Sequence, residues 1–178
     1  MRAFVAAEIT DAEVLDSIAR MQSEMKIAAK PVELQNMHFT LLFLGEIQDD
    51  VAGKVVGQLE GMEFLPFEVS FEGAGAFPKP RFPRVIWIGV KDGRDQIIQL
   101  AKNVEERLAP LGFSADKPFK PHITIFRIKN SSSDITKQLS KYSLARFGRQ
   151  LISEIKLKRS VLTPQGPVYS DVGVVTAR

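Results

Sequence analysis

The stretch His38-Phe39-Thr40-Leu41 recurs as His122-Ile123-Thr124-Ile125, and these two places hold the only histidines among the 178 residues. In each, one apolar residue separates the histidine from a threonine, and another apolar residue follows. Residues i and i+2 of a β-strand point to the same face, so each triplet would present an imidazole beside a hydroxyl. Because histidine exchanges protons near neutral pH, we expect the two to work as a pair.

The apolar pattern around the two triplets predicts the same order of elements in both halves of the chain. Each half would run strand, helix, His-x-Thr strand, helix, strand. A segment with three glycine or proline clusters, residues 73–83, is predicted to be a loop. We expect strands over residues 1–9, 37–44, 64–71, 85–90, 122–128, 151–161 and 168–175, and helices over 11–25, 48–62 and 93–108 and after a cap in 131–134.

The repeated order of elements predicts the fold class. The distance from helix start to histidine is 27 residues in the first half and 29 in the second. We therefore expect a single bilobal α+β domain over residues 1–178, with an internal duplication of roughly 1–90 and 91–178. The two lobes would be related by a pseudo-twofold axis, each with a mainly antiparallel sheet and outer helices. An active-site cleft would lie between them.

Composition limits the classes of protein to which the chain can belong. The absence of cysteine excludes disulfides, thiolate metal sites and a cysteine nucleophile. No signal peptide or membrane-spanning run is visible, so we expect a cytoplasmic protein without a membrane partner. Residues 1–90 carry 8 Lys or Arg against 13 Asp or Glu, whereas residues 91–178 carry 16 against 8. The basic second half suits a polyanionic partner such as RNA, although proteins that bind no polyanion also show it.

The two triplets indicate chemistry at phosphorus. Two half-sites related by an approximate twofold axis would approach a phosphorus atom from opposite sides, as in-line displacement requires. One neutral histidine would take a proton from water, and the other, protonated, would give one to the departing oxygen. A metal site is the alternative, but two histidines without cysteines and without a carboxylate in either triplet make a poor zinc site. We expect no metal.

Several residues near the triplets are candidates for substrate contacts. Arg127 is the best phosphate ligand among the cations around the second triplet, because guanidinium matches phosphate oxygens. Strict alternation, however, places Arg127 opposite His122 and Thr124, so it can reach the site only through a twist or bulge after Ile125. Phe4 and Phe43 could stack on a base, although core packing would also explain both.

With the triplets placed, the chain resembles the two-histidine (2H) phosphoesterase superfamily, and within it the ThpR/LigT family of RNA 2′,3′-cyclic phosphodiesterases, also called 2′-5′ RNA ligases. The resemblance covers nearly the whole chain. It rests on several co-linear motifs: Arg2–Ala6, His38–Gly45, the Phe-Pro-Lys-Pro motif at 77–80, Pro83–Gly89, His122–Arg127 and Leu162–Tyr169.

This resemblance implies metal-free hydrolysis of a terminal 2′,3′-cyclic phosphate to a 2′-phosphomonoester, and reversible 2′-5′ ligation toward tRNA-half-like ends without a nucleotide cofactor. It implies that His38 is the proton donor and His122 the proton acceptor. Thr40 and Thr124 would hold phosphate oxygens, and Arg127 matches the arginine that follows the second motif in the family. We also expect Phe4 to contact the substrate. The protein is expected to be a monomer.

Two other functions stay open. The chain could be a non-catalytic module that binds RNA ends, which the basic second half would suit. It could also be a cyclic phosphodiesterase for a small nucleotide, which would share the chemistry and differ only in the pocket.

Overall fold

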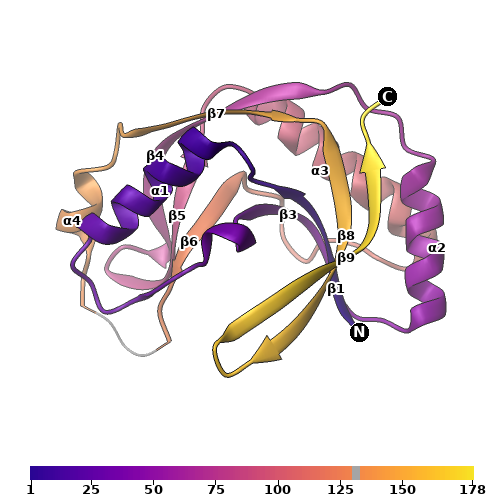
Figure 1. The fold of residues 1–178 in the computed structure, drawn as a ribbon, viewed down its shortest axis with the longest axis horizontal. Helices are drawn as coiled ribbons and strands as arrows, with labels where there is room; N and C mark the ends of the chain where they lie inside the picture. Colours follow the sequence, from indigo (N-terminus) through magenta and orange to yellow (C-terminus); the bar gives the residue numbers. More distant parts are fainter. Residues whose placement is uncertain (130–132) are drawn as a thin grey trace.

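Two antiparallel sheets, each containing one His-x-Thr strand, form the framework of the molecule (Figure 1). The structure is a computed structural model that describes residues 1–129 and 133–178. The four-stranded sheet has the order β3-β1-β8-β9, and the five-stranded sheet has the order β2-β6-β5-β4-β7. The strands are β1 (Arg2–Glu8), β2 (Lys30–Pro31), β3 (His38–Glu46), β4 (Phe67–Lys79), β5 (Phe82–Val90), β6 (His122–Arg127), β7 (Arg146–Ile152), β8 (Glu154–Thr163) and β9 (Gly166–Thr176).

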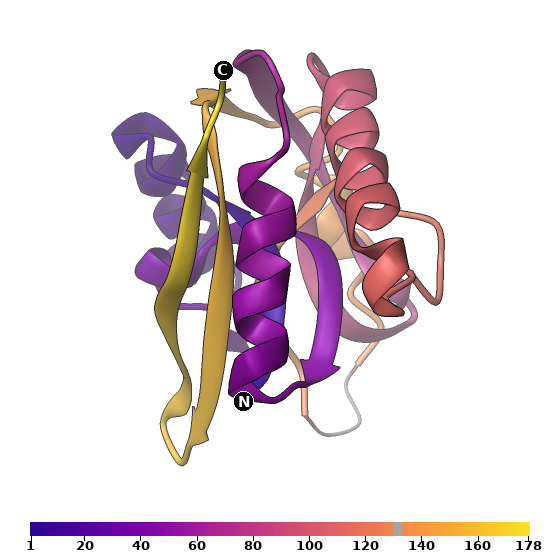
Figure 2. The ribbon, with the colours of Figure 1, turned by 90° about the vertical axis from the view of Figure 1, so that its right-hand side faces the viewer.

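The helices cover the outer faces of the two sheets. α1 buries Val14, Ile18 and Met21 at helical spacing, and Figure 1 shows it over the five-stranded sheet. α2 and α3 contact each other on the side of the four-stranded sheet (Figure 2). The bounds are α1 (Ala12–Glu24), α2 (Asp49–Glu60), α3 (Arg94–Leu108) and α4 (Thr136–Ser140), with short 3-10 turns η1 (Leu34–Asn36) and η2 (Ala109–Leu111).

The α+β prediction and most of the predicted elements are confirmed. Asp11 is the N-cap of α1, and its carboxylate accepts a hydrogen bond from the backbone N–H of Val14 at 3.0 Å. The predicted helices over 48–62 and 93–108 are α2 and α3. The predicted cap in 131–134 falls partly on residues outside the described ranges; among the described ones, the Asp134 carboxylate accepts from the backbone N–H of Thr136.

The loop predicted over residues 73–83 is wrong, because this segment forms most of the β4–β5 hairpin. Gly75 explains the error. It lies under the indole of Trp87, and a Cβ atom there would come within 2.3 Å of the ring. Glycine is therefore present for close packing across the hairpin rather than for a turn. Strands β2 and β7 were also absent from the prediction.

Each sheet takes strands from both halves of the sequence. The N-terminal strands β1 and β3 pair with the C-terminal β8–β9 hairpin, whereas β4 and β5 pair with β6 and β7. Within this arrangement, β1-α1-β3 and β5-α3-β6 follow the same pattern, with the two strands of each unit adjacent and antiparallel. The duplication of residues 1–90 and 91–178 stays a prediction about the sequence.

In the part of the chain that the structure describes, no helix combines the length and apolar character that crossing a bilayer requires.

Candidate active site

The two His-x-Thr triplets begin the strands β3 and β6 and keep the expected alternation. Phe39 and Ile123, between the two polar residues, are fully buried in the core. His38 and Thr40 therefore share the opposite, accessible face of β3, as His122 and Thr124 do on β6.

Both strands then contain a bulge at the same distance from the histidine. Leu41 has no partner on β1, since Thr40 pairs with Ala6 and Leu42 with Val5. In β6, Ile125 is the unmatched residue. The bulge buries two consecutive apolar side chains in each strand and returns the next residue to the accessible face.

The bulge in β6 decides the position of Arg127. Strict alternation would have turned Arg127 away from His122, and the sequence allowed it to reach the site only through a twist or bulge after Ile125. Because of the bulge at Ile125, Arg127 lines the same cavity as His122 and Thr124. Phe43 is the residue at the equivalent position of β3, three residues after Thr40. The two half-sites therefore differ in that one presents a guanidinium and the other an aromatic ring.

The two triplets meet at a small cavity of about 40 Å³ between the sheets. Its lining brings both predicted histidines, both threonines and the arginine together in one place. The lining residues are Val32, Asn36, His38, Thr40, His122, Thr124, Arg127 and Tyr169.

Hydrogen bonds orient the two imidazoles. His38 Nδ1 lies 2.6 Å from the carbonyl oxygen of Asn36, and His122 Nδ1 lies 2.5 Å from that of Lys120. A carbonyl oxygen only accepts, so Nδ1 carries the proton in each neutral ring. Nε2 is then the basic nitrogen of both rings, and that of His38 lies 2.9 Å from the hydroxyl oxygen of Thr40.

The surroundings lower the pKa of both histidines below the ordinary value. Burial is the main cause in each case, because it disfavours the charged ring. The hydrogen bonds to the Asn36 and Lys120 carbonyls act in the opposite direction. The positive charge of Arg127 lowers the pKa of both rings further. Both imidazoles are therefore mainly neutral at neutral pH in the free protein.

Aromatic side chains hold each histidine ring. The His38 ring lies 5.0 Å from the Phe4 ring and 5.5 Å from the Tyr169 ring, measured between centroids. The His122 ring lies 5.1 Å from that of Phe77. Phe4 borders a cavity but is only 4% exposed, so packing against His38 is its main observed contact, and substrate contact stays a prediction. Tyr169 was not among the predicted site residues, although it ends the motif Leu162–Tyr169 on which the family resemblance partly rests.

An ion-pair cluster lies behind His38 in the four-stranded sheet. Glu8 is the residue of β1 directly opposite His38. Its carboxylate pairs with Lys156 and, at 3.4 Å, with Lys158, whose side chain is only 9% exposed. Asp171 of β9 pairs with the same two lysines at 2.9 and 2.7 Å. The cluster links β1, β8 and β9 under the His38 half-site.

A second, larger cavity of about 540 Å³ adjoins the small one on the His38 side. His38, Thr40, Arg127 and Tyr169 line both cavities, whereas His122 and Thr124 line only the small one. The four-stranded sheet contributes an aromatic and apolar wall that includes Phe43 and Leu162, together with Arg2, and the five-stranded sheet contributes Lys30 and Arg127. The turn of the β8–β9 hairpin contacts β2 beside this cavity, where Lys30 Nζ donates to the Gln165 carbonyl at 2.6 Å.

Comparisons with known proteins agree with this geometry. The family model described as LigT like Phosphoesterase matches residues 9–87 and again residues 88–169. An RNA 2′,3′-cyclic phosphodiesterase of Archaeoglobus fulgidus is 41% identical, over 98% of this chain and 99% of its own length. One of Aeropyrum pernix is 38% identical, over 93% and 94%. The crystal structure of the Thermus thermophilus protein TT0787 superposes with a TM-score of 0.83 at 28% identity, covering 100% of this chain and 98% of that one.

Proposed function

The chain belongs to the LigT-like phosphoesterase family, and from this we propose that it hydrolyses the 2′,3′-cyclic phosphate at the end of an RNA to a 2′-phosphomonoester without a metal ion. The observation that supports this most strongly is the small cavity that both His-x-Thr pairs line. A tetrahedral phosphate between the two pairs would meet one imidazole and one hydroxyl from each sheet.

The proposed reaction is one in-line displacement. His122 Nε2 takes a proton from water, the water oxygen bonds to phosphorus, and the bond from phosphorus to O3′ breaks. His38 Nε2–H gives its proton to the departing O3′, so the product carries a free 3′-hydroxyl and a 2′-phosphate. The anionic diester stabilises the imidazolium of His38 while it is bound, which offsets the lowered pKa of the free ring.

The large cavity supports this assignment of donor and acceptor. His38 lines it whereas His122 does not, and its volume of about 540 Å³ is large enough for a nucleoside. With the nucleoside there, the ribose oxygens face His38 and the attacking water faces His122. Thr40, Thr124 and Arg127 are proposed to hold the non-bridging oxygens, because hydroxyl and guanidinium groups donate to them.

We further propose that the enzyme acts as a cytoplasmic monomer on tRNA-half-like ends. In the reverse direction, a 5′-hydroxyl in place of water would give 2′-5′ ligation.

The pH dependence follows from the two lowered pKa values. Catalysis needs one neutral and one protonated histidine, so kcat/KM should be highest between the two pKa values, below pH 6.5. Above pH 6.5 the singly protonated form is lost, and kcat/KM should fall by about tenfold per pH unit. Initial rates between pH 4.5 and 8.5 measure this. A rate that stays constant or rises from pH 6.5 to 8 would contradict it.

The test of the proposed function uses a short RNA that ends in a 2′,3′-cyclic phosphate, in buffer with EDTA. We expect the cyclic end to disappear and a 2′-phosphate to form, as phosphorus NMR can identify. A protein that only binds RNA ends would leave the substrate intact, and a 3′-phosphate product would contradict the assigned leaving oxygen. Free nucleoside 2′,3′-cyclic phosphates tested in parallel measure the preference for RNA over a small nucleotide.

A further inference from the structure

A row of cations starts at Arg127 of the catalytic site and continues across one end of the five-stranded sheet. We call it the basic rim, and it consists of Lys30, Lys79, Arg81, Arg84, Arg127 and Lys129. All six are exposed. Within residues 1–129 and 133–178, none of them forms an ion pair within 4.0 Å.

Backbone contacts between neighbouring strands bring the residues of the rim near one another. Lys30 of β2 pairs with Arg127 of β6. The backbone N–H of Ile128, next to Lys129, donates to the carbonyl of Arg84 at 2.9 Å. At the hairpin end, β4 and β5 bring Lys79 opposite Phe82. The rim therefore begins at the large cavity, of which Lys30, Arg127 and Lys129 are lining residues, and continues to the tip of the β4–β5 hairpin.

The far end of the rim carries an exposed aromatic ring. Phe82 is 58% exposed at the hairpin tip. Lys79 Nζ and the Arg81 guanidinium carbon lie 5.3 and 5.7 Å from the centroid of its ring. An aromatic face between cations is the arrangement with which proteins bind single-stranded nucleic acid, where bases stack and phosphates pair with the charges.

The Phe82 ring and its two neighbouring cations lie far from the catalytic residues. Trp87 of β5 pairs with Thr124, and five residues along the strand lead from it to Phe82. At the rise of a strand this is about 17 Å, farther than one nucleotide reaches. Two carboxylates lie near the row, Glu33 in the large cavity and Asp134 near Arg81, so the cations outnumber them three to one.

We propose that the basic rim is a binding track for single-stranded RNA, with Phe82 stacking on a base several nucleotides upstream of the terminal cyclic phosphate. The inference rests on the proposed function, since the strand is positioned by its end in the catalytic cavity. Charge complementarity and continuity with the large cavity favour RNA as the occupant. The enzyme is then selective for oligonucleotide ends over dinucleotide ends.

The test compares a dinucleotide and an octanucleotide with the same 3′-terminal sequence and a 2′,3′-cyclic phosphate. We expect kcat/KM to be at least about tenfold higher for the octanucleotide, the effect of one stacked base. Phe82→Ser and the double variant Lys79→Gln/Arg81→Gln should each remove most of this advantage and change dinucleotide turnover less than about twofold. The double variant should also reduce the slope of log kcat/KM against log salt by about 1.4, because two phosphate contacts are lost.

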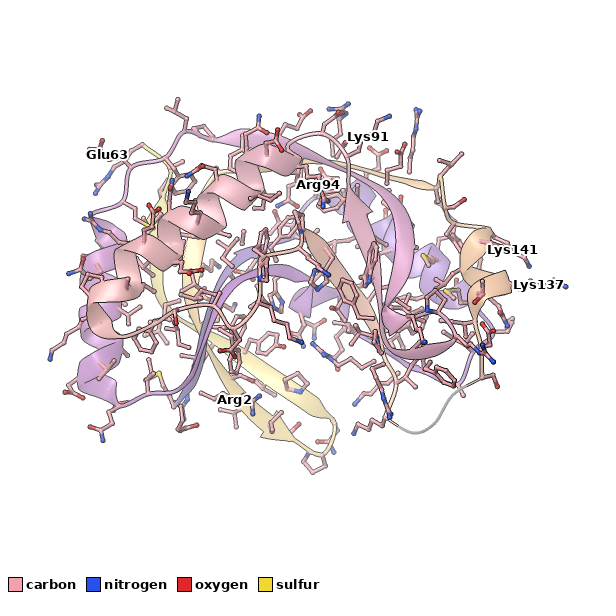
Figure 3. The ribbon with its side chains drawn as sticks, turned by 180° about the vertical axis from the view of Figure 1, so that it is seen from behind. Arg2, Glu63, Lys91, Arg94, Lys137 and Lys141 are labelled. Carbon is pink, nitrogen blue, oxygen red and sulfur yellow. The ribbon has the colours of Figure 1, made fainter. Side chains whose placement is uncertain are left out.

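Matched controls lie elsewhere on the surface. Leu65→Ser removes an apolar side chain that is 79% exposed. Arg94→Gln/Lys102→Gln removes two exposed cations on α3, and Figure 3 shows Arg94 near the start of this helix, away from Arg2. Neither control should change the octanucleotide advantage. Equal kcat/KM for the dinucleotide and the octanucleotide would contradict the RNA-binding track but not the proposed function. Rim variants that slow hydrolysis of both substrates equally would do the same. Failure to hydrolyse even the dinucleotide would overturn the proposed function as well.

Discussion

Replacing His122 with alanine is expected to lower kcat/KM for an RNA 2′,3′-cyclic phosphate by about 10²–10⁴-fold, because the attacking water loses the base that accepts its proton. Replacing His38 should have an effect of the same size, because O3′ would then leave as an alkoxide. Single-turnover rates on purified variants measure both losses. Thermal unfolding of the same samples is the control, since both rings pack against aromatic side chains that their removal would loosen.

The activities of the two histidine variants should differ from each other when the leaving atom of the substrate is changed from oxygen to sulfur. A substrate with sulfur at the 3′ bridging position needs no proton on departure, because a thiolate is a good leaving group. This substrate should restore most of the activity of His38→Ala and little of that of His122→Ala. The reverse pattern of rescue would exchange the two roles. Full activity of either variant on the natural substrate would rule out paired acid–base catalysis.

The second large effect is expected at Arg127. Replacing it with glutamine should lower kcat/KM by about 10²–10³-fold, as for loss of one preorganised donor to a developing oxyanion. It should also move the pH optimum upward, because the positive charge of Arg127 lowers the pKa of both histidines. The shift in pH optimum reports the nearness of the Arg127 charge to both rings, whereas the loss of kcat/KM reports the proposed phosphate contact.

Arg159→Gln is the matched control for this variant. Arg159 is an exposed arginine of β8, and it lines neither cavity. Its replacement should leave both kcat/KM and the pH profile unchanged. An Arg127→Gln enzyme with near-normal kcat/KM would contradict the phosphate contact that we propose. An unshifted pH optimum would contradict the coupling of the Arg127 charge to the two histidines.

The sequence predicts the core of this site because the relevant signal is local. Side chains alternate between the two faces of a β-strand, so His38 lies beside Thr40 and His122 beside Thr124 whatever the rest of the fold. The repeat of the triplet at a similar distance from a helix predicted two related units. These are statements about neighbours in one strand, and strand geometry alone supports them.

The position of Arg127 could not be derived in this way, because a bulge breaks the period. Ile125 and Phe126 are both buried, which two consecutive residues of a regular strand with one wet face cannot be. In β6 a signal was present as the two successive apolar residues Ile125-Phe126 before Arg127. In β3, four apolar residues, Leu41 to Leu44, follow Thr40 without a break, so no such pair marks the bulge.

Other features depend on contacts between distant parts of the chain. Tyr169 reaches His38 only because the β8–β9 hairpin pairs with β1, more than 140 residues away in sequence. Residues 73–83 were predicted as a loop because of their glycine and proline clusters, whereas they form most of the β4–β5 hairpin, in which Gly75 makes room for Trp87. Pairing across such distances leaves no local periodicity from which it could be predicted.

The central claim is that one histidine acts on each side of phosphorus in a single in-line displacement. The most direct test is the stereochemistry of hydrolysis of one diastereomer of a 2′,3′-cyclic phosphorothioate in water enriched in ¹⁸O. Attack from the His122 side with departure toward His38 predicts a chiral 2′-phosphorothioate with inverted configuration at phosphorus. Retention of configuration would require an even number of displacements and would contradict the proposed mechanism.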